Sequence, residues 1–162
     1  MNSPVPSPLA IDLGRLLGRR GLVAATAESC TGGLIAGAIT DVPGSSGWFD
    51  RGFVTYSNDA KVAMLGVRAQ TLDTHGAVSE ATAAEMAAGA LAHSSADLAV
   101  AVTGIAGPDG GSDAKPVGTV CFAWARRGGP VATLTRRFPG DRAAVRQATV
   151  ELALQGLIDR AN

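Results

Sequence analysis

The sequence predicts an α/β fold, a single-domain α/β/α sandwich with a mixed, mostly parallel sheet and one C-terminal hairpin. Segments with helical spacing of apolar residues alternate with short apolar runs, as in sheets covered by helices on both faces. The first of these runs is continuous rather than alternating, which is typical of buried parallel strands. Two alternating segments near the C-terminus are separated by Gly128 and Gly129, which indicates a hairpin. A length of 162 residues suits one domain.

The N-terminal half is expected to hold three helices and two strands. Residues 1–8 contain three prolines and two serines and are predicted to form a flexible lead-in to a single domain at 9–162. A leucine stripe predicts a helix that Gly21 ends. The predicted elements are a helix at 9–20, a strand at 22–27, a helix at 34–39, a loop at 43–47, a strand at 49–56 and a helix at 58–65.

The C-terminal half begins with residues 66–76, which we expect to be irregular. Ser79 is placed to cap an alanine-rich helix running to about His93, with Glu80 at its positive end. The next predicted elements are a strand at 98–103, a glycine-rich loop at 104–116 and the hairpin strands 117–125 and 131–138. Asp141 is predicted to cap a last helix whose buried stripe contains Val145, Ala148 and Leu152.

Composition excludes several classes of protein. Fourteen basic and fourteen acidic residues cancel, and aromatic residues make up 4%, so we expect no direct nucleic-acid partner. No apolar run is long enough to cross a bilayer and no signal-peptide pattern is present, so we expect a cytoplasmic protein without a membrane partner. Cys30 and Cys121 lie in unrelated settings, which indicates a reducing compartment. No cluster has metal-ligand spacing, and we predict neither a metal nor a cofactor.

Three polar or glycine-rich segments follow predicted strands, at 28–33, 56–61 and 103–111. Ligands collect beyond the carboxyl ends of strands in open α/β sheets, so we expect these segments to converge on one pocket. Ser29 lies at a strand-to-helix junction, where backbone N–H groups can stabilise an oxyanion. The alternative is that Ser29 or Thr31 merely caps the helix.

Lys61 and Tyr56 are candidates for activating a hydroxyl. Lys61 is one of two lysines in a chain with twelve arginines, and it is expected near the positive end of a helix, which disfavours its charged form. A lysine with a lowered pKa can act as a base, whereas arginine keeps its proton. Tyr56 is placed to relay or orient a proton between a serine and a lysine. A solvated lysine and an ordinary strand tyrosine are the alternatives.

Cys30 is a rival nucleophile, because a helix N-terminus lowers the pKa of a thiol. It would need a histidine partner, and the chain contains only His75 and His93. Neither is an evident partner, which favours a packed neighbour over a nucleophile.

The glycine-rich segment 103–111 presents successive N–H groups of the kind that bind phosphate or carboxylate. It lacks the residue order of a Walker loop and of a dinucleotide fold. Arg142 and Arg146 lie one helical turn apart at the start of the last helix, where a phosphate would relieve their unfavourable position. A solvated helix face is the alternative.

Five segments in this order resemble the C-terminal domain of the CinA (competence/damage-inducible) family. They are residues 27–33, 54–58 together with Lys61, 76–79, 103–108 and 140–142, and they cover nearly the whole chain. Stand-alone members of this family are nicotinamide mononucleotide amidohydrolases, and longer members carry an additional N-terminal domain. The resemblance implies deamidation of nicotinamide mononucleotide to nicotinate mononucleotide and ammonia, in NAD recycling.

The resemblance also implies a Ser-Tyr-Lys catalytic set, which maps onto Ser29, Tyr56 and Lys61. We expect the oxyanion to be held by the backbone at Cys30, Thr31 and Gly32. The expected substrate-binding residues are Gly33, Thr103, Gly104, Ala106, Gly107 and Arg142. The partner would be a small-molecule substrate, and the alanine-rich composition suits a homo-oligomer. The rival hypothesis is a non-catalytic module that senses a nucleotide or docks on a protein linked to competence or DNA damage.

Overall fold

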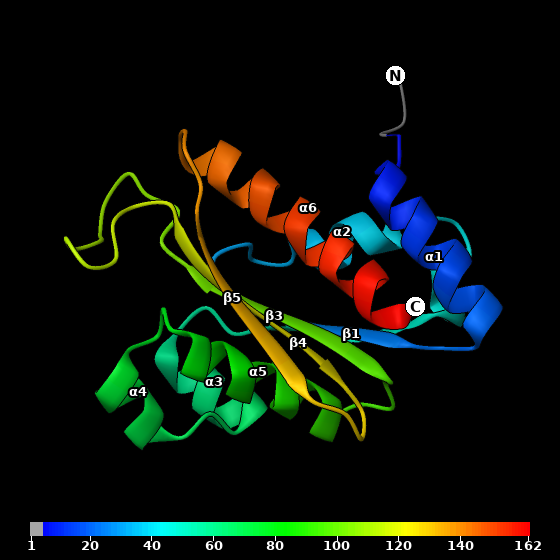
Figure 1. Ribbon diagram of the computed structural model, residues 1–162, viewed down its shortest axis with the longest axis horizontal. Helices are drawn as coiled ribbons and strands as arrows, with labels where there is room; N and C mark the ends of the chain where they lie inside the picture. The colour runs from blue at the N-terminus through cyan, green and yellow to red at the C-terminus, as the bar shows by residue number, and fades with distance from the viewer. Residues whose placement is uncertain (1–4) are drawn as a thin grey trace.

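The computed structural model describes residues 5–162 as a five-stranded sheet between two layers of helices (Figure 1). One face carries α1 (Pro8–Arg20), α2 (Leu34–Thr40) and α6 (Arg142–Ala161). The other face carries α3 (Asn58–Leu65), α4 (Ala69–His75) and α5 (Glu80–Ala92). The strands are β1 (Ala24–Glu28), β2 (Phe49–Val54), β3 (Leu98–Gly104), β4 (Thr119–Arg126) and β5 (Val131–Arg137), with a short 3-10 turn, η1 (Ser45–Gly47), before β2. The predicted α/β/α sandwich is confirmed.

The strand order is β2-β1-β3-β4-β5. β1 pairs in parallel with β2 and β3, whereas β4 is antiparallel to β3 and to β5. The sheet is therefore mixed, with β4 alone reversed among the five strands, and β4–β5 is the predicted hairpin. The chain leaves β2 on one side of β1 and returns as β3 on the other. This is the topological arrangement at which open sheets bind ligands.

The two faces of the sheet differ in how closely helices approach. Under α1, α2 and α6 the core contains large side chains, among them Phe122 and Trp124, whose rings stack with centroids 5.4 Å apart. Under α5 the sheet contributes mainly alanines, which meet further alanines of the helix: Ala25, Ala27, Ala99, Ala101 and Ala123 face Ala83, Ala87 and Ala90. Small side chains on both surfaces let α5 pack closely against the sheet that positions the pocket.

The prediction of an irregular segment at 66–76 is wrong, because it contains α4. The carboxylate of Glu85 in α5 accepts hydrogen bonds from the Arg68 backbone N–H, at 2.8 Å, and from the Thr71 hydroxyl. Arg68 is the N-cap of α4 and provides no side-chain cap of its own. A residue from a different helix thus organises the start of α4, and His75 ends that helix instead of lying in a loop.

Other boundaries shift by a few residues. α1 starts at Pro8, inside the predicted lead-in, and residues 1–4 of that lead-in lie outside the described residues. β2 ends at Val54, so Tyr56 follows the strand. Of the residues predicted to form the buried stripe of α6, Val145 is buried, whereas Ala148 and Leu152 are only half-buried. The buried face of this helix instead continues from Val145 through Thr149, Ala153, Gly156 and Leu157.

Candidate active site

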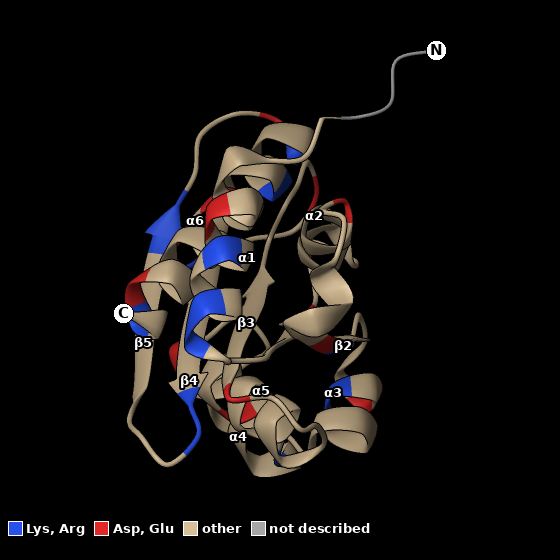
Figure 2. Ribbon diagram, turned by 90° about the vertical axis from the view of Figure 1, so that its right-hand side faces the viewer, with Lys and Arg blue, Asp and Glu red and all other residues tan. Residues whose placement is uncertain are grey.

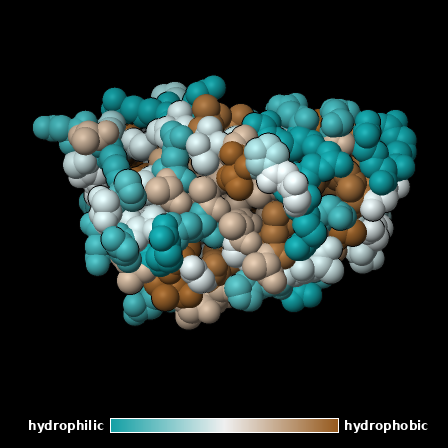
Figure 3. Space-filling view, turned by 60° about the horizontal axis from the view of Figure 1, so that its bottom comes forward, coloured by the Kyte–Doolittle hydropathy of each residue, from teal (hydrophilic) through white to brown (hydrophobic). Residues whose placement is uncertain are grey.

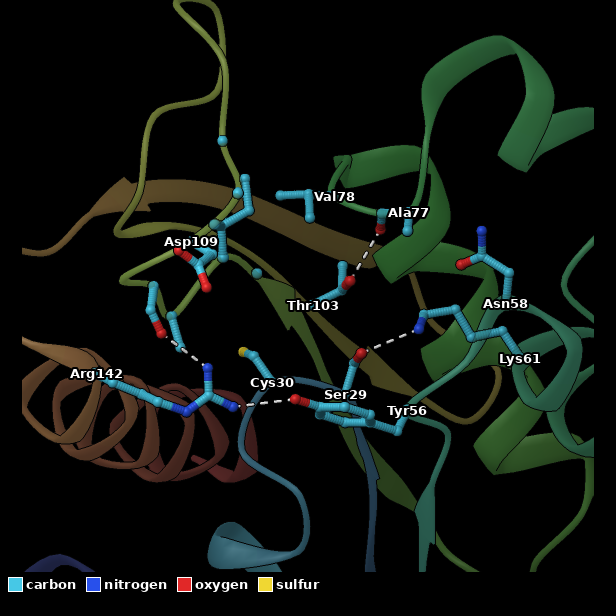
Figure 4. A pocket seen from close by; sticks show the side chains of 16 residues that line it. Ser29, Cys30, Tyr56, Asn58, Lys61, Ala77, Val78, Thr103, Asp109 and Arg142 are labelled. Carbon is cyan, nitrogen blue, oxygen red and sulfur yellow. Dashed lines mark hydrogen bonds between the residues drawn. The ribbon is translucent and has the colours of Figure 1, made fainter.

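The carboxyl ends of β1, β2 and β3 form one row. Glu28 of β1 is in register with Val54 of β2 and Val102 of β3. Two further hydrogen bonds extend the row, from Ser29 N–H to the Val102 carbonyl (3.1 Å) and from Thr55 N–H to the Glu28 carbonyl (2.8 Å). The segments after the three strands therefore start side by side, and they line one cavity of about 300 Å³ (Figure 4). The predicted convergence is confirmed.

Ser29 and Lys61 are in direct contact inside this cavity. Lys61 Nζ lies 3.0 Å from Ser29 Oγ and donates a second hydrogen bond to the Thr55 carbonyl at 2.9 Å. Lys61 is the fourth residue of α3, whose N-terminus Ser57 caps by accepting from Ala60 N–H at 3.0 Å. The Lys61 side chain is among the largest fully buried ones, and only 1% of the residue is exposed.

The environment of Lys61 favours its uncharged form. Burial lowers the pKa of the Lys61 amine below its ordinary value, because the charged form loses its hydration. Within residues 5–162 the salt bridges join Arg51 to Asp50 and Arg68 to Glu85, so none offsets this effect at Lys61. The amine is placed to accept a proton from the Ser29 hydroxyl.

Glu28 organises the turn that carries Ser29. Its fully buried carboxylate accepts hydrogen bonds from the Thr31 hydroxyl (2.6 Å) and from the N–H groups of Ile35 (2.9 Å) and Ala36 (3.0 Å). The N-cap residue of α2 is Gly33, at φ 104°, which has no side chain to cap the helix. The cap is thus the Glu28 carboxylate rather than Ser29 or Thr31, and the Ser29 hydroxyl remains available to Lys61.

The backbone of the turn offers two free donors. Gly32 N–H donates to the Ser29 carbonyl at 3.0 Å, so this member of the predicted oxyanion group is already engaged. The N–H groups of Cys30 and Thr31 have no hydrogen-bond acceptor within the described part of the chain. Cys30 also lines the cavity beside Ser29.

Cys30 itself is not activated. Burial raises the pKa of its thiol to about 11, and this effect outweighs the lowering by its own backbone N–H and by the nearby Arg146 and Lys61 side chains. A thiol with this pKa carries little thiolate at neutral pH. His75 and His93 do not line the cavity, and the His93 ring contacts the Gly89 carbonyl of its own helix. Burial of the thiol and the absence, within residues 5–162, of a histidine from the cavity lining therefore argue against a thiolate nucleophile at Cys30.

Tyr56 lies at the mouth of the cavity rather than between Ser29 and Lys61. It is 62% exposed, and its hydroxyl accepts a hydrogen bond from Arg142 Nη2 at 3.0 Å. Arg142 Nη1 donates to the Gly107 carbonyl at 2.9 Å. Figure 4 shows the Tyr56 ring beside Ser29, with its hydroxyl turned away from Lys61 toward Arg142. The sequence predicts Tyr56 between Ser29 and Lys61 as a proton relay. Because these two side chains contact each other directly, Tyr56 does not occupy that position.

The remaining predicted residues divide into two groups. Thr103, Gly104, Ala106 and Gly107 line the cavity. The Thr103 hydroxyl is used internally and donates to the Ala77 carbonyl at 2.9 Å. The other group lies in the turn below the cavity and does not line it: Thr31, Gly32 and Gly33.

Comparison with known proteins identifies the family. Residues 7–161 match the family model of the CinA C-terminal domain. The chain belongs to the CinA C-terminal domain family. The predicted resemblance is thereby confirmed.

Relatives of this CinA domain differ in length. The nicotinamide-nucleotide amidohydrolase PncC of Escherichia coli K12 is 57% identical over 149 residues, which span 92% of this chain and 90% of the relative. A putative competence-damage inducible protein of Symbiobacterium thermophilum is 58% identical over 88% of this chain but only 35% of its own length. The crystal structure of the competence/damage inducible protein CihA from Agrobacterium tumefaciens superposes with a TM-score of 0.94 at 52% identity, covering 99% of this chain and all of that one.

Three features of this CinA-family site were not predicted from the sequence: the capping role of Glu28, the Thr55 carbonyl that holds Lys61, and the position of Asn58 in the cavity wall. Glu28 had a local signal, since an acidic residue at the end of an apolar strand and before a helix suits the positive helix end. Across residues 5–162 no group of three or more potential metal-ligating acidic, histidine or cysteine side chains is found, and no helix there is long and apolar enough to span a membrane.

Proposed function

We propose that this protein is a nicotinamide-nucleotide amidohydrolase that converts nicotinamide mononucleotide to nicotinate mononucleotide and ammonia. The observation that carries the proposal is the buried contact of 3.0 Å between Ser29 Oγ and Lys61 Nζ inside the cavity. The name of the Escherichia coli relative, 57% identical along nearly the full length of both chains, supports the same reaction. The substrate would be a small nucleotide, and the reaction hydrolysis of a carbon–nitrogen amide bond.

In the first step the uncharged Lys61 amine takes the proton of the Ser29 hydroxyl as its oxygen attacks the carboxamide carbon. The carbonyl oxygen becomes an oxyanion. The Cys30 N–H is the donor best placed to stabilise it, because Cys30 lines the cavity next to the nucleophile and its N–H has no backbone acceptor in residues 5–162.

In the second step the Lys61 ammonium returns its proton to the amide nitrogen, and the carbon–nitrogen bond breaks to release ammonia. An ester between Ser29 and the nicotinoyl group remains. Lys61, again uncharged, takes a proton from water as its oxygen attacks the ester, and the proton passes back to Ser29. The product is a carboxylic acid, which loses a proton to water to give the carboxylate, and the enzyme returns to its starting state.

Substrate binding is assigned to the end of the cavity away from Lys61. Arg142 supplies the positive charge there, the end of β3 supplies Thr103 and Gly104, and the loop after β3 supplies Ala106 and Gly107. We propose that these groups hold the ribose phosphate, which leaves the carboxamide facing Ser29. Tyr56, the third member of the expected catalytic set, would orient Arg142 and the substrate through its hydroxyl.

An ammonia-release assay with nicotinamide mononucleotide tests the proposal. We expect release by the wild-type protein and its loss in Ser29→Ala, with unchanged circular dichroism. Nucleotide binding without ammonia release would instead favour the sensing module. A docking module would show neither.

We also propose that the reaction serves NAD recycling in the cytoplasm and that residues 8–162 form one domain, since both core clusters share the same sheet. Basic and acidic residues alternate over the side drawn in Figure 2, in keeping with a small-molecule partner. Apolar surface interrupts the polar surface on the face carrying α3, α4 and α5 (Figure 3). Exposed apolar side chains, including Val62 and Met64 of α3, support the predicted homo-oligomer, which light scattering on the purified protein would measure.

A further inference from the structure

Arg146 contacts the turn that carries the nucleophile. Its Nε donates to the Cys30 carbonyl at 3.1 Å, and its Nη2 donates to the Thr31 carbonyl at 3.2 Å. These are two adjacent donors of one planar guanidinium bound to two successive carbonyls. Arg146 does not line the cavity that holds Ser29. The turn thus separates it from the reacting atoms.

This contact determines which way the turn's N–H groups point. In a planar trans peptide the N–H points opposite to the carbonyl of the same unit. Because the Cys30 carbonyl faces Arg146, the Thr31 N–H of that peptide points away from α6. In the next peptide unit the Thr31 carbonyl also accepts from Arg146. The N–H of that unit, which belongs to Gly32, donates to the Ser29 carbonyl at 3.0 Å and completes the turn.

The turn is held from a second side by Glu28, which accepts from the Thr31 hydroxyl at 2.6 Å. Glu28 fixes a side chain of the turn, whereas Arg146 fixes its carbonyls. Gly32 lies at φ 55° between the two contacts, so the backbone there lacks the restriction that a β-carbon would impose. Because Gly32 leaves the backbone of this turn flexible, contacts from outside the turn, such as those of Arg146, are needed to keep its carbonyls in a fixed orientation.

We propose that Arg146 is a positioning residue for the hydrolysis, whose fork holds the Cys30 and Thr31 carbonyls so that the turn keeps the Ser29 hydroxyl and the Cys30 N–H in place at the cavity. This inference rests on the proposed amidohydrolase function. The positive charge of the Arg146 guanidinium beside the two carbonyls also polarises their peptide units, which makes the N–H groups of those units stronger donors. The geometry therefore assigns Arg146 to the turn, unlike Arg142, which borders the cavity and is assigned to the phosphate.

The test compares Arg146→Met and Arg146→Lys with the wild type in steady-state hydrolysis of nicotinamide mononucleotide. Methionine keeps much of the apolar stem but has no donor, whereas lysine keeps the charge without the fork. Loss of one oxyanion donor lowers kcat about 10²–10³-fold, and here the donor is loosened rather than removed. We expect kcat of Arg146→Met to fall about 10–100-fold, with KM within about threefold of wild type and Arg146→Lys in between.

Two controls separate this role from others. Gln147→Ala changes the adjacent exposed residue, whose side chain hydrogen-bonds to Glu151 (3.3 Å), and should leave both constants unchanged. Competitive inhibition by ribose 5-phosphate reports on the phosphate site and should be the same in Arg146→Met and wild type. Thermal unfolding of each variant verifies that the chain is folded.

A rise in KM with kcat retained, or weaker inhibition by ribose 5-phosphate, would make Arg146 a phosphate ligand and overturn the proposal. Wild-type kcat in Arg146→Met would overturn it as well. If Arg146→Met does not fold, wild-type kcat in folded Arg146→Lys overturns it and a reduced kcat at unchanged KM supports it. Absence of ammonia release by the wild type refutes the proposed function itself, an outcome distinct from the others.

Discussion

Replacing Lys61 tests the chemistry most directly, since the lysine amine is the only base in contact with Ser29 Oγ among the described residues. In Lys61→Met the side chain keeps a similar length and fills the same buried space, but the two hydrogen bonds of 3.0 and 2.9 Å are lost. In Lys61→Arg a permanent charge replaces an amine able to lose its proton. Neither variant can accept the proton of Ser29.

The expected loss of activity follows from the role of the base. General base catalysis contributes about 10²–10⁴-fold, which corresponds to roughly 3–5 kcal/mol of transition-state stabilisation. We expect both variants to lose at least this factor in kcat. In the wild type, kcat/KM should fall as the pH drops through the lowered pKa of Lys61, because protonation removes the base.

Although Lys61→Met should lose activity, its free energy of unfolding should be higher than that of the wild type. The pKa of Lys61 lies below its ordinary value of 10.5 in the folded protein, so the unfolded chain binds this proton more tightly. Wild-type stability therefore rises with pH between the lowered pKa and 10.5, and the cost of the buried amine is fully present below that window. Methionine removes this cost, so the advantage of Lys61→Met in unfolding free energy should be largest at neutral pH and shrink toward pH 10.5.

The assay is ammonia release from nicotinamide mononucleotide, combined with urea unfolding at neutral and alkaline pH. Ser29→Ala provides the reference for a protein without the nucleophile. Turnover of Lys61→Arg or Lys61→Met within a factor of three of wild type, in folded protein, would remove the lysine from the mechanism.

Four further substitutions have defined outcomes. Cys30→Ala should keep near-normal turnover, because a thiol of pKa about 11 is not the nucleophile; loss of ammonia release in the folded variant would contradict this. Glu28→Gln directs an amide NH₂ toward the donors of the turn and should cost about 1–3 kcal/mol in urea unfolding, with reduced kcat; unchanged stability would argue against the cap. Gly89→Ala places a β-carbon against the Leu65 carbonyl and should lower the unfolding temperature, whereas Gly37→Ala, on an open helix face, should raise or maintain it.

Much of the local structure follows from short-range patterns. Ser79 caps α5 where the sequence places it, α3 covers the predicted residues 58–65, and Gly21 ends α1 in the left-handed conformation. These features depend on residues within three or four positions of one another, so a single segment contains the information. α4 is the exception, because its start depends on Glu85 in a different helix.

The candidate chemistry was predictable only as a set of residue types. A serine at a strand-to-helix junction and a rare lysine near a helix start could be recognised from the chain alone. Their contact could not, because a distance of 3.0 Å between residues 32 positions apart depends on the pairing of β1 with β2 and on the packing of α3. The same holds for the Tyr56 hydroxyl, which bonds to Arg142 rather than to the serine.

The amino-acid sequence by itself determined the fold class, the family and the identity of Ser29 and Lys61, because periodicity, caps and motifs are encoded in neighbouring residues. The tertiary structure alone decided that Lys61 is buried against Ser29, that Glu28 caps α2 and that Arg146 holds the turn. The Lys61 and Arg146 contacts join residues 32 and 116 positions apart, which meet only when the sheet forms and both helical layers pack on it. Burial, which lowers the pKa of the lysine, is a property of that assembly and of no single segment.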